Sequence, residues 1–258
     1  MSSAIWTPTA LSSETRPHGG KAWRLVEAQH RVSTLRLVDS LTEQALLEAV
    51  LDETKPPMPA ECAGLDYLFY TPFRYRPYPS GSRFRRAGAT PGVWYGSERV
   101  ETALAEMVFY RFLFFADSPD TPFPDQAAEF TGFSARIAAA ALDLTTPPLN
   151  RDAALWTHLT DYAACQALAD GARGAGVGII RYLSVRDPKA AANLAVLTCT
   201  AFARPAPVDR QTWRIRIGRF GAQALREHPD LRMEFGRNAF AADPRLAAMN
   251  WDRKRPRR

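Results

Sequence analysis

The sequence predicts an α+β protein with a compact mixed β-sheet flanked by helices. Three observations support this fold class. An amphipathic stretch over residues 97–115 is followed by a loosely alternating stretch at 135–144, and a second helical stretch follows at 152–170. Two short apolar runs, 177–184 and 194–202, then have the length and composition of buried strands. Helices interspersed with strands in this order indicate an α+β fold with a compact mixed sheet, and the sequence contains no internal repeat.

Composition sets the class of protein before any motif is considered. The chain has 258 residues, of which 46% are hydrophobic and 23% charged, enough for one large domain with extensions. No apolar run has membrane-spanning length, and the first residues lack the apolar core of a signal peptide. Cys62, Cys165 and Cys199 are widely spaced and form no CxxC pair. They predict a reducing, cytoplasmic location and argue against a disulfide framework or a zinc site.

Both ends of the chain are expected to be mobile. Residues 1–21 are polar and contain Pro and Gly, with Trp6 as the one side chain suited to docking. The net charge is +6, and residues 253–258 (RKRPRR) carry five of those charges. We interpret them as a basic disordered tail that adds only weak, salt-dependent affinity for polyanions.

The first elements are identified by their boundaries. Ser40 to Glu43 (SLTE) forms a capping box, which predicts a helix that ends near Pro56. Its helically spaced apolar residues are Leu46, Leu47, Val50 and Leu51. Residues 67–76 are predicted to be extended because Pro72 disfavours a helix there. Gly92 to Gly96 is predicted as a short strand bounded by glycines.

The next helix has a clear start. Ser97 is a suitable N-cap, and Glu98 and Glu101 lie in the first turn, where the helix dipole favours anions. An apolar series follows at helical spacing: Val100, Ala103, Leu104, Met107, Val108, Phe112 and Phe115. Glu106 lies opposite the Val100/Leu104/Val108 side but among other apolar groups. We therefore expect Glu106 to be partly buried. A solvated glutamate is the usual case on a helix, whereas buried carboxylates need partners and are commoner at functional sites.

The secondary structure of the second half of the chain is less clearly indicated by the sequence. The helix at 152–170 presents Leu155, Leu159, Tyr162 and Gln166 on one side, and glycines at 171, 174 and 176 end it. These glycines follow a helix and precede a strand, the reverse of the order in a dinucleotide-binding fingerprint. Residues 213–217 (WRIRI) are a further candidate strand, and residues 218–250 have mixed periodicity.

An arginine cluster is the main chemical signal. Five arginines fall between residues 74 and 86, and a guanidinium binds phosphate bidentately. Arg85 and Arg86 fit a solvated loop. Arg74 and Arg83 are each followed by an aromatic residue, Tyr75 or Phe84, in a segment expected to face a core. Tyr95 ends a buried strand, where core packing and stacking on a planar ligand are equally consistent.

Several motifs together resemble the RES-domain family. They are PFRY (72–75), GSRF (81–84), GVWYGSE (92–98), ETALAE (101–106) and YLSVRDP (182–188) followed by NLAV (193–196). The resemblance extends over residues 22–204 and leaves 205–252 as a C-terminal extension packed on the domain. It implies an ADP-ribosyltransferase-like split sheet and a toxin of a bacterial toxin–antitoxin pair, whose antitoxin is an Xre-like helix-turn-helix protein.

The resemblance also implies the activity and the site. Family members destroy NAD by hydrolysis or phosphorolysis of the nicotinamide–ribose bond, with NAD as substrate and no other cofactor or metal. Position by position, the site residues would be Arg83, Tyr95, Glu106 and Ser184. An additional arginine is expected, for which we choose Arg74, with Tyr75 beside it, over Arg24 or Arg31. Phe84 and Arg85 depart from the Trp and Asn that usually follow the family's arginine.

Two other functions stay open at this point. Some family members transfer ADP-ribose to a protein instead. A non-catalytic nucleotide- or operator-binding module would instead make Glu106 a structural residue. The sequence leaves the acceptor of ADP-ribose (water, phosphate or protein) undecided. It also leaves open a homo-oligomer.

Overall fold

The computed structural model describes residues 6–28, 37–75, 81–88 and 91–253. Its fold is α+β, as predicted. The helices are α1 (Pro8–Ser13), α3 (Leu41–Glu53), α4 (Tyr67–Arg74), α5 (Val100–Asp117), α6 (Ala153–Trp156), α7 (Ala163–Gly174) and α8 (Pro244–Ala247). Short 3₁₀ turns lie at Ala60–Cys62, Leu149–Asp152 and Cys199–Ala201. The strands are β1 (Arg16–Glu27), β2 (Trp94–Ser97), β3 (Ala128–Asp143), β4 (Ile179–Leu183), β5 (Ala192–Val196), β6 (Asp209–Gly218), β7 (Gly221–Arg226) and β8 (Leu231–Gly236).

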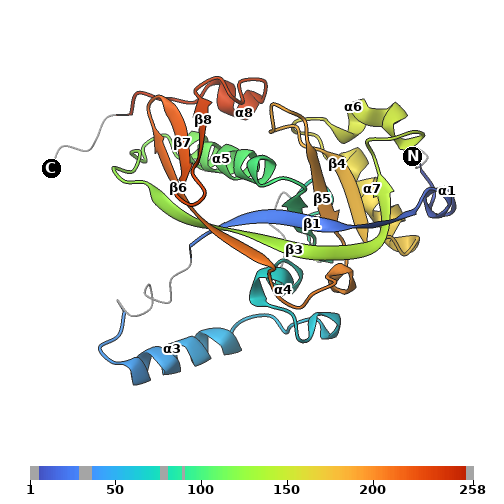
Figure 1. The fold of residues 1–258 in the computed structure, drawn as a ribbon, viewed down its shortest axis with the longest axis horizontal. Helices are drawn as coiled ribbons and strands as arrows, with labels where there is room; N and C mark the ends of the chain where they lie inside the picture. Colours follow the sequence, from blue (N-terminus) through green and yellow to red (C-terminus); the bar gives the residue numbers. More distant parts are fainter. Residues whose placement is uncertain (1–5, 29–36, 76–80, 89–90, 254–258) are drawn as a thin grey trace.

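The strands form one mixed sheet in the order β1-β2-β5-β4-β3-β6-β7-β8. Strand β1 also pairs antiparallel with β3 along its whole length, from Arg16 opposite Ala141 to Glu27 opposite Phe130. The pairings β1–β2, β2–β5, β5–β4, β4–β3 and β3–β1 therefore close into a ring. Strands β1 and β3 run side by side across the molecule, and β6, β7 and β8 continue the sheet from β3 in front of α5 (Figure 1).

Strand β2 separates two layers of side chains. Trp94 points into a core cluster with Phe69, Phe133 and Phe202, which helix α4 covers. Tyr95, the next residue, packs against the cluster that contains Phe84. This alternation follows from the two-residue period of a strand. Residues on α4 consequently lie on the opposite face of β2 from the Tyr95 ring.

Helix α5 packs on the core along its apolar side, as its apolar series predicted. Leu104, Val108 and Phe112 are completely or almost completely buried. They belong to one cluster with Trp213 of β6 and Phe235 of β8. The segment after residue 204 therefore contributes strands to the same sheet and side chains to the same core. Its last helix, α8, adds Leu246 to that cluster.

Residues 6–21, the described part of the N-terminal segment, form a helix and the start of a strand where the sequence suggested a mobile extension. Residues 8–13 form α1, capped by the Thr7 hydroxyl, which accepts the amide of Ala10. Leu11 is fully buried, and residues 16–21 belong to β1. Trp6 docks through its indole N–H on Asp152, 2.9 Å away. The burial of one leucine and the pairing of β1 with β3 fix a segment whose polarity alone indicated mobility.

Helix α4 occupies residues 67–74 of the segment that was predicted to be extended at 67–76, and Arg76 lies outside the described residues. Asp66 caps it by accepting the amide of Leu68. Pro72 lies inside the helix and has no N–H to offer the carbonyl of Leu68, four residues earlier. The indole N–H of Trp94 donates to that carbonyl instead, at 3.1 Å. A distant tryptophan thus satisfies the group that proline leaves open.

The helix predicted at 152–170 is interrupted. Helix α6 ends at Trp156 and α7 begins at Ala163, with a polar turn between them. In that turn the His158 Nδ1 atom accepts the amides of Thr160 and Asp161, and the Asp161 carboxylate accepts the amide of Ala163. Short polar side chains that bond local amides compete with a continuous helix. Helix α7 then extends beyond Gly171 to Gly174.

Two cysteines are paired, contrary to the sequence expectation. Cys62 and Cys199 form a disulfide across 137 positions of sequence, with their Cα atoms 5.2 Å apart. Both lie in short 3₁₀ turns that pack together beside α4. Cys165 is free and buried. Such long-range pairing depends on the tertiary fold, so spacing along the chain carries no signal for it.

Helix α3 confirms the capping box but packs little. The Ser40 hydroxyl accepts the amide of Glu43, while the Glu43 carboxylate reaches back to the amide of Asp39. None of its residues is buried, and Leu46 is 65% exposed. The helix lies apart from the sheet at one edge of the molecule (Figure 1). Within the described residues, no helix has the length and apolar character needed to cross a membrane.

The C-terminal end differs from the predicted tail at its first residue. The Arg253 guanidinium donates to the carbonyls of Phe115, Ser118 and Thr121 at the end of α5. Arg253 therefore anchors the chain to the domain. Residues 254–258 lie outside the described residues.

Candidate active site

The loop at 81–88 is held on β2 by a tyrosine. The Tyr95 hydroxyl accepts the amide of Phe84 at 2.9 Å and shares a hydrogen bond with the Ser82 hydroxyl at 2.8 Å. Gly81 has a φ of 68°, in the left-handed region, and an added Cβ there would meet the backbone of Arg85. Burial raises the pKa of Tyr95 to about 12, so the phenol stays neutral at physiological pH. Tyr95 thus positions the loop that carries Arg83.

Arg83 is the buried arginine of this loop, with only 8% of its surface exposed. Its Nη1 atom donates to the carbonyl of Trp156 at 2.7 Å. The guanidinium lies over the ring of Tyr162, with 4.6 Å between Cζ and the ring centroid. Contacts on two sides therefore hold a fixed cation in the site.

Glu106 accepts two hydrogen bonds on one oxygen. Its Oε1 atom receives the Ser184 hydroxyl at 2.7 Å and the Asn193 amide at 2.6 Å. Asn193 is itself oriented by Ser97, whose hydroxyl donates to Asn193 Oδ1 at 2.6 Å. Among the described residues, no hydrogen bond or ion pair reaches Oε2. The carboxylate is half-buried, as predicted, with one oxygen fixed and the other available.

Ser97 does not cap α5 as the sequence suggested. It is the last residue of β2, and its hydroxyl is used in orienting Asn193. The cap position belongs to Arg99, and Glu98 pairs with Arg181 through two hydrogen bonds of 2.6 and 3.0 Å. The polar cluster at the start of α5 therefore connects the helix to β4 and β5.

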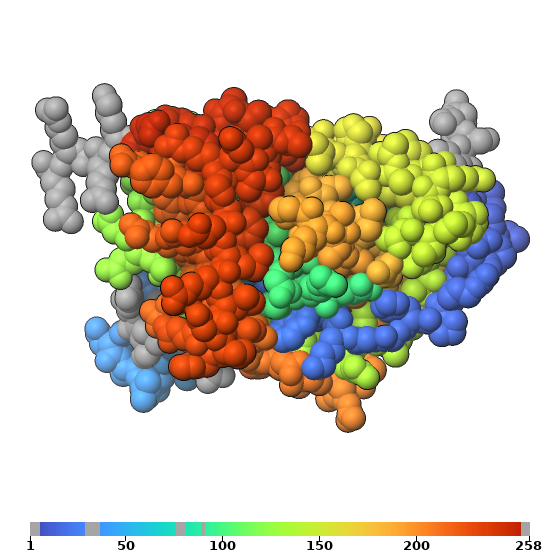
Figure 2. Space-filling view, turned by 45° about the horizontal axis from the view of Figure 1, so that its top comes forward, coloured from blue at the N-terminus to red at the C-terminus, as the bar shows by residue number. Residues whose placement is uncertain are grey.

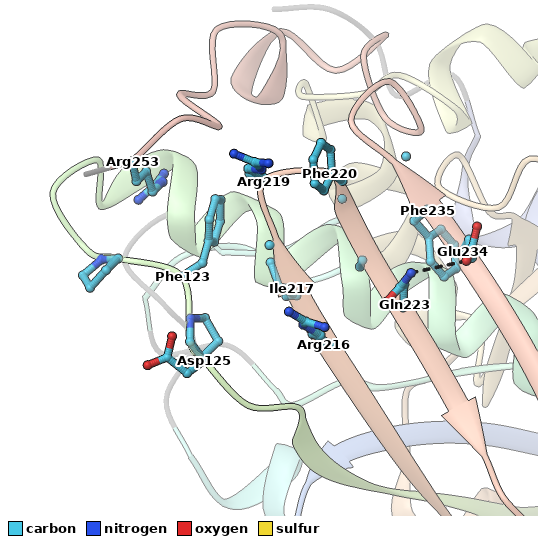
Figure 3. Close-up of a pocket in the computed structure, with 16 residues that line it drawn as sticks. Phe123, Asp125, Arg216, Ile217, Arg219, Phe220, Gln223, Glu234, Phe235 and Arg253 are labelled. Atoms are coloured by element: carbon cyan, nitrogen blue, oxygen red, sulfur yellow. Dashed lines mark hydrogen bonds between the residues drawn. The ribbon is translucent and has the colours of Figure 1, made fainter. Parts of the chain in front are cut away.

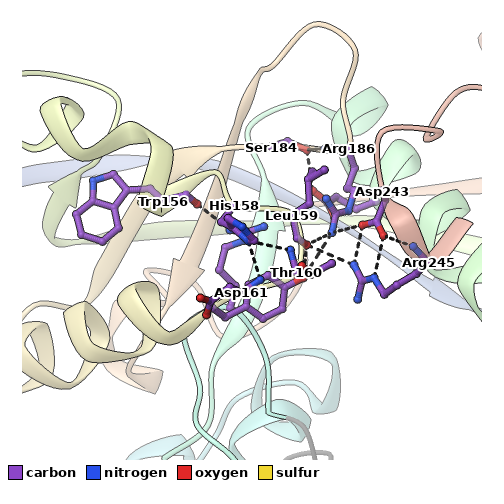
Figure 4. A network of polar contacts seen from close by, with 12 residues as sticks. Trp156, His158, Leu159, Thr160, Asp161, Ser184, Arg186, Asp243 and Arg245 are labelled. Atoms are coloured by element: carbon purple, nitrogen blue, oxygen red, sulfur yellow. Dashed lines mark hydrogen bonds and ion pairs between the residues drawn. The ribbon is translucent and has the colours of Figure 1, made fainter. Parts of the chain in front are cut away.

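Ser184 begins a tight turn that faces α5. Its Oγ atom accepts the amides of Arg186 and Asp187, at 3.2 and 3.1 Å, while it donates to Glu106. A hydroxyl can serve as donor and acceptor together, which suits serine to this position. Figure 4 shows Ser184 and Arg186 side by side in the turn.

One side of α5 carries three contacts to this turn. Thr102 donates to the Asp187 carboxylate at 2.7 Å, and Glu106 accepts from Ser184. The ring of Phe109 lies under the Arg186 guanidinium, 4.0 Å from Cζ to the centroid. Residues four and seven apart lie on one face of a helix, so the turn docks along a single stripe of α5.

Three of the predicted site residues, Glu106, Tyr95 and Arg83, affect the pKa of Tyr182. Burial raises its pKa well above the ordinary value, and the negative charge of Glu106 raises it further, while Arg83 opposes the rise. Its ring contacts the ring of Phe84, with centroids 4.8 Å apart. Tyr182 thus lies within the influence of Glu106, Tyr95 and Arg83.

The structure does not bring Arg74 or Tyr75 to this group. Arg74 ends α4 and donates to the carbonyl of Pro56 and to Asp52. The carbonyl of Tyr75 accepts from Arg85, and its ring is exposed. Arg24, the alternative choice, lies over Trp94, on the α4 side of β2. Arg31 is outside the described residues.

Sequence reasoning missed four neighbours of the site: Tyr162, Tyr182, Arg186 and Asn193. Only Asn193 had a readable signal. Asn193 is a polar residue in β5, a strand whose other residues are apolar and buried, and a buried side-chain amide needs hydrogen-bond partners. The others come from loops or strands whose packing partners are distant in sequence.

The site lies where the C-terminal segment meets the body of the domain. The red C-terminal residues adjoin the orange 180–200 segment on one face, with green α5 residues between them (Figure 2). A separate groove of about 600 Å³ lies between the 122–125 loop and strands β6 to β8. Figure 3 shows Arg219, Phe220 and Arg253 along its rim. None of the predicted site residues lines it.

The fold and the grouped side chains define an α+β protein with a polar site built around a fixed carboxylate. The family model of the RES domain matches residues 58–217, which is more than half of the chain. The chain therefore belongs to the RES-domain family. The match begins and ends later than the motif-based span of 22–204.

Two further comparisons add little beyond the family. No curated protein matches the sequence significantly. A chain of the M. tuberculosis MbcT–MbcA toxin–antitoxin complex aligns with a TM-score of 0.47 and 14% identity. The alignment covers 79% of this chain and 89% of that chain.

Proposed function

We propose that this protein is the toxin of a bacterial toxin–antitoxin pair and depletes NAD by cleaving the nicotinamide–ribose bond. The observation that carries this proposal is the state of Glu106. Two neutral donors fix one carboxylate oxygen, and the other has no protein partner among the described residues. A preoriented anion and a buried arginine, both close enough to Tyr182 to affect its pKa, suit a substrate that develops positive charge at one end and is negatively charged at the other.

The chemistry requires little from the protein. The bond between ribose C1′ and the nicotinamide nitrogen breaks, and its electron pair leaves with neutral nicotinamide. The ribose becomes an oxocarbenium-like cation, which the Oε2 atom of Glu106 stabilises directly or through a ribose hydroxyl. Water or phosphate then forms a new bond to C1′ and releases its proton to solvent. Electrostatic stabilisation of developing charge is often the largest catalytic effect in an enzyme.

The other residues take supporting roles in this proposal. Arg83 binds the diphosphate, because its planar guanidinium matches phosphate oxygens and two contacts already fix it. Tyr95 holds the Arg83 loop through its hydroxyl and offers its half-buried ring to the nicotinamide. Ser184 and Asn193 orient Glu106. An Xre-like antitoxin would block the site, and the cytoplasm, where NAD is abundant, is the proposed location.

Glu106→Gln tests the proposal most directly. This substitution keeps the size of the side chain and removes the charge that faces the ribose. We expect nicotinamide release from NAD to fall about 10²–10³-fold in turnover, with little change in melting temperature. Glu101→Gln is the matched control, because it makes the same change on the same helix five residues earlier. Chromatographic analysis of the products, with and without phosphate, would also identify the acceptor of ADP-ribose.

The same pair of variants tests the toxin role in cells. Expression of the wild-type chain and of Glu101→Gln should arrest bacterial growth and lower cellular NAD. Glu106→Gln, expressed to the same level, should do neither. Full growth with abundant folded wild-type protein would contradict the proposal, as would near-normal turnover by folded Glu106→Gln.

A further inference from the structure

The turn at 184–187 has a third anchor, which comes from the C-terminal segment. The Arg186 side chain is only 4% exposed, and its Nη2 atom lies 3.3 Å from the carboxylate of Asp243, which is 2% exposed. The same Nη2 atom donates to the carbonyl of Leu159 at 3.0 Å. Figure 4 shows Asp243 between Arg186 and Arg245. A buried ion pair therefore joins the turn to the start of α8.

Asp243 is built to stay ionised at this position. Its carboxylate accepts three hydrogen bonds from Arg245, two from the side chain at 2.9 and 2.8 Å and one from the amide at 3.1 Å. Burial alone would raise the pKa of Asp243, but the Arg245 hydrogen bonds and the Arg186 charge outweigh it and lower that pKa. Asp243 is thus a fixed anion that neutralises a buried arginine.

Arg186 depends on this anion. Its Nη1 atom is buried without a hydrogen-bond partner, and the Phe109 ring lies beneath the guanidinium. Asp243 is the carboxylate with which Arg186 forms an ion pair among the described residues. Without it, the cation would remain in a nearly dry environment with only carbonyl, hydroxyl and ring contacts, which is a strong drive for the side chain to leave.

Movement of Arg186 would reach Glu106 through the backbone. The Arg186 amide donates to Ser184 Oγ, and that same oxygen donates to Glu106 Oε1. We propose that Asp243, outside the span matched by the RES family model, is a positioning residue of the active site that aligns Glu106 through Arg186 and Ser184. This inference rests on the proposed function for its kinetic consequence. It assigns to the C-terminal segment a part in the site rather than a purely structural one.

The first test is Asp243→Asn, which keeps the shape and removes the charge. We expect kcat for nicotinamide release to fall about 10²-fold, as misplacement of a catalytic group by about an ångström does, with KM nearly unchanged. Asp209→Asn is the matched control. Asp209 lies in the same segment and binds Ser134 and Lys21 on another part of the sheet, so its loss should leave kcat unchanged.

A double-mutant cycle shows whether the effect passes through Ser184. In a Ser184→Ala background the route from Arg186 to Glu106 is already broken, so Asp243→Asn should cost little more. Equal losses in both backgrounds would overturn the proposal. If Asp243→Asn does not fold, the pair Arg186→Gln with Asp243→Asn removes both buried charges at once and should fold. Wild-type kcat in that folded pair would also overturn it.

Hydrogen exchange supplies a measurement that does not need activity. The amides of Arg186 and Asp187 donate to Ser184 Oγ, so Asp243→Asn should speed their exchange while β6 and β7 peptides stay unchanged. Unchanged exchange at 184–187 would count against the positioning role. If the wild-type protein releases no nicotinamide, the proposed function fails, and this measurement still decides whether Asp243 holds the turn.

Discussion

At the scale of single residues, Tyr95 shows how one side chain can be structural and functional together. Its hydroxyl fixes the loop of Arg83, while its ring remains half-buried beside the site. The hydroxyl accepts the amide of Phe84 and shares a hydrogen bond with the Ser82 hydroxyl. Burial of the phenol raises the pKa of Tyr95, and the hydrogen bonds with Ser82 and Phe84 oppose part of that rise.

This gives a pH-dependent prediction. The pKa of Tyr95 is about 12 in the folded protein, against about 10 for a tyrosine in an unfolded chain. The unfolded state then loses its proton first, so the contribution is complete below pH 10 and is lost as the pH rises toward 12. By pH 11 the loss should be about 1 kcal/mol of unfolding free energy.

Tyr95→Phe isolates this effect from the other tyrosines. Urea unfolding at pH 8, 10 and 11 should show a steeper decline for the wild-type protein than for the variant. Identical declines would mean that Tyr95 does not carry the shift. Arg86→Lys, which alters an exposed ion pair to Asp170 near the same loop, should follow the wild-type decline.

Residue-scale predictions from sequence succeeded where local pattern determined the environment. The helical wheel placed Glu106 among apolar groups, and the structure shows it half-buried. Arg74 was chosen because its segment looked extended, and the helix at that position turns the side chain toward Pro56 and Asp52. The choice depended on a backbone conformation that Trp94 stabilises from 26 residues away.

At the scale of elements, α3 and α5 are opposites. Both have clear apolar positions in the sequence, yet α5 buries them and α3 buries none. Helix α3 also begins with a good cap and is only 13 residues long, which is marginal for a helix without tertiary packing. Its existence was predictable from the capping box. Its exposure was not, because periodicity does not reveal whether a partner surface exists.

A pair of substitutions should expose the difference. Leu104→Ala, at a fully buried position of α5, should lower the free energy of unfolding by about 2–5 kcal/mol. Leu46→Ala, at an exposed position of α3, should change it by no more than about 0.5 kcal/mol. Thermal denaturation followed by circular dichroism would check both. A large loss for Leu46→Ala would show that α3 packs against something in solution.

At the scale of the whole molecule, sequence order gave the class but not the closure of the sheet. The β1–β3 pairing joins residues more than a hundred positions apart, and the Cys62–Cys199 bond spans 137. Neither leaves a local pattern. The sequence shows no clear secondary-structure pattern over residues 218–250. In the structure this region contains β7, β8 and α8, and their buried side chains belong to the same core cluster as those of α5.

The C-terminal end yields a prediction at this scale. Residues 254–258 carry four positive charges, and Arg253 before them binds three carbonyls at the end of α5. Deleting 254–258 should weaken binding to duplex DNA and flatten its salt dependence, with turnover and melting temperature unchanged. Deleting 253–258 should lower the melting temperature as well. Equal melting temperatures for the two deletions would show that the Arg253 contacts contribute nothing measurable.

The stripe on α5 limits how this chain can change in length. The three side chains of this stripe each contact one residue of the turn: Thr102 contacts Asp187, Glu106 contacts Ser184, and Phe109 contacts Arg186. They share one face of the helix because the steps between them are four and three positions. One inserted or deleted residue between them would rotate the later side chains by about 100° and shift them by about 1.5 Å along the axis. Substitutions could be absorbed one at a time, but an indel between Thr102 and Glu106 would detach two of the three contacts together, and one between Glu106 and Phe109 would detach the third. Related chains that keep this site should therefore have substitutions over residues 102–109, but no insertions or deletions there.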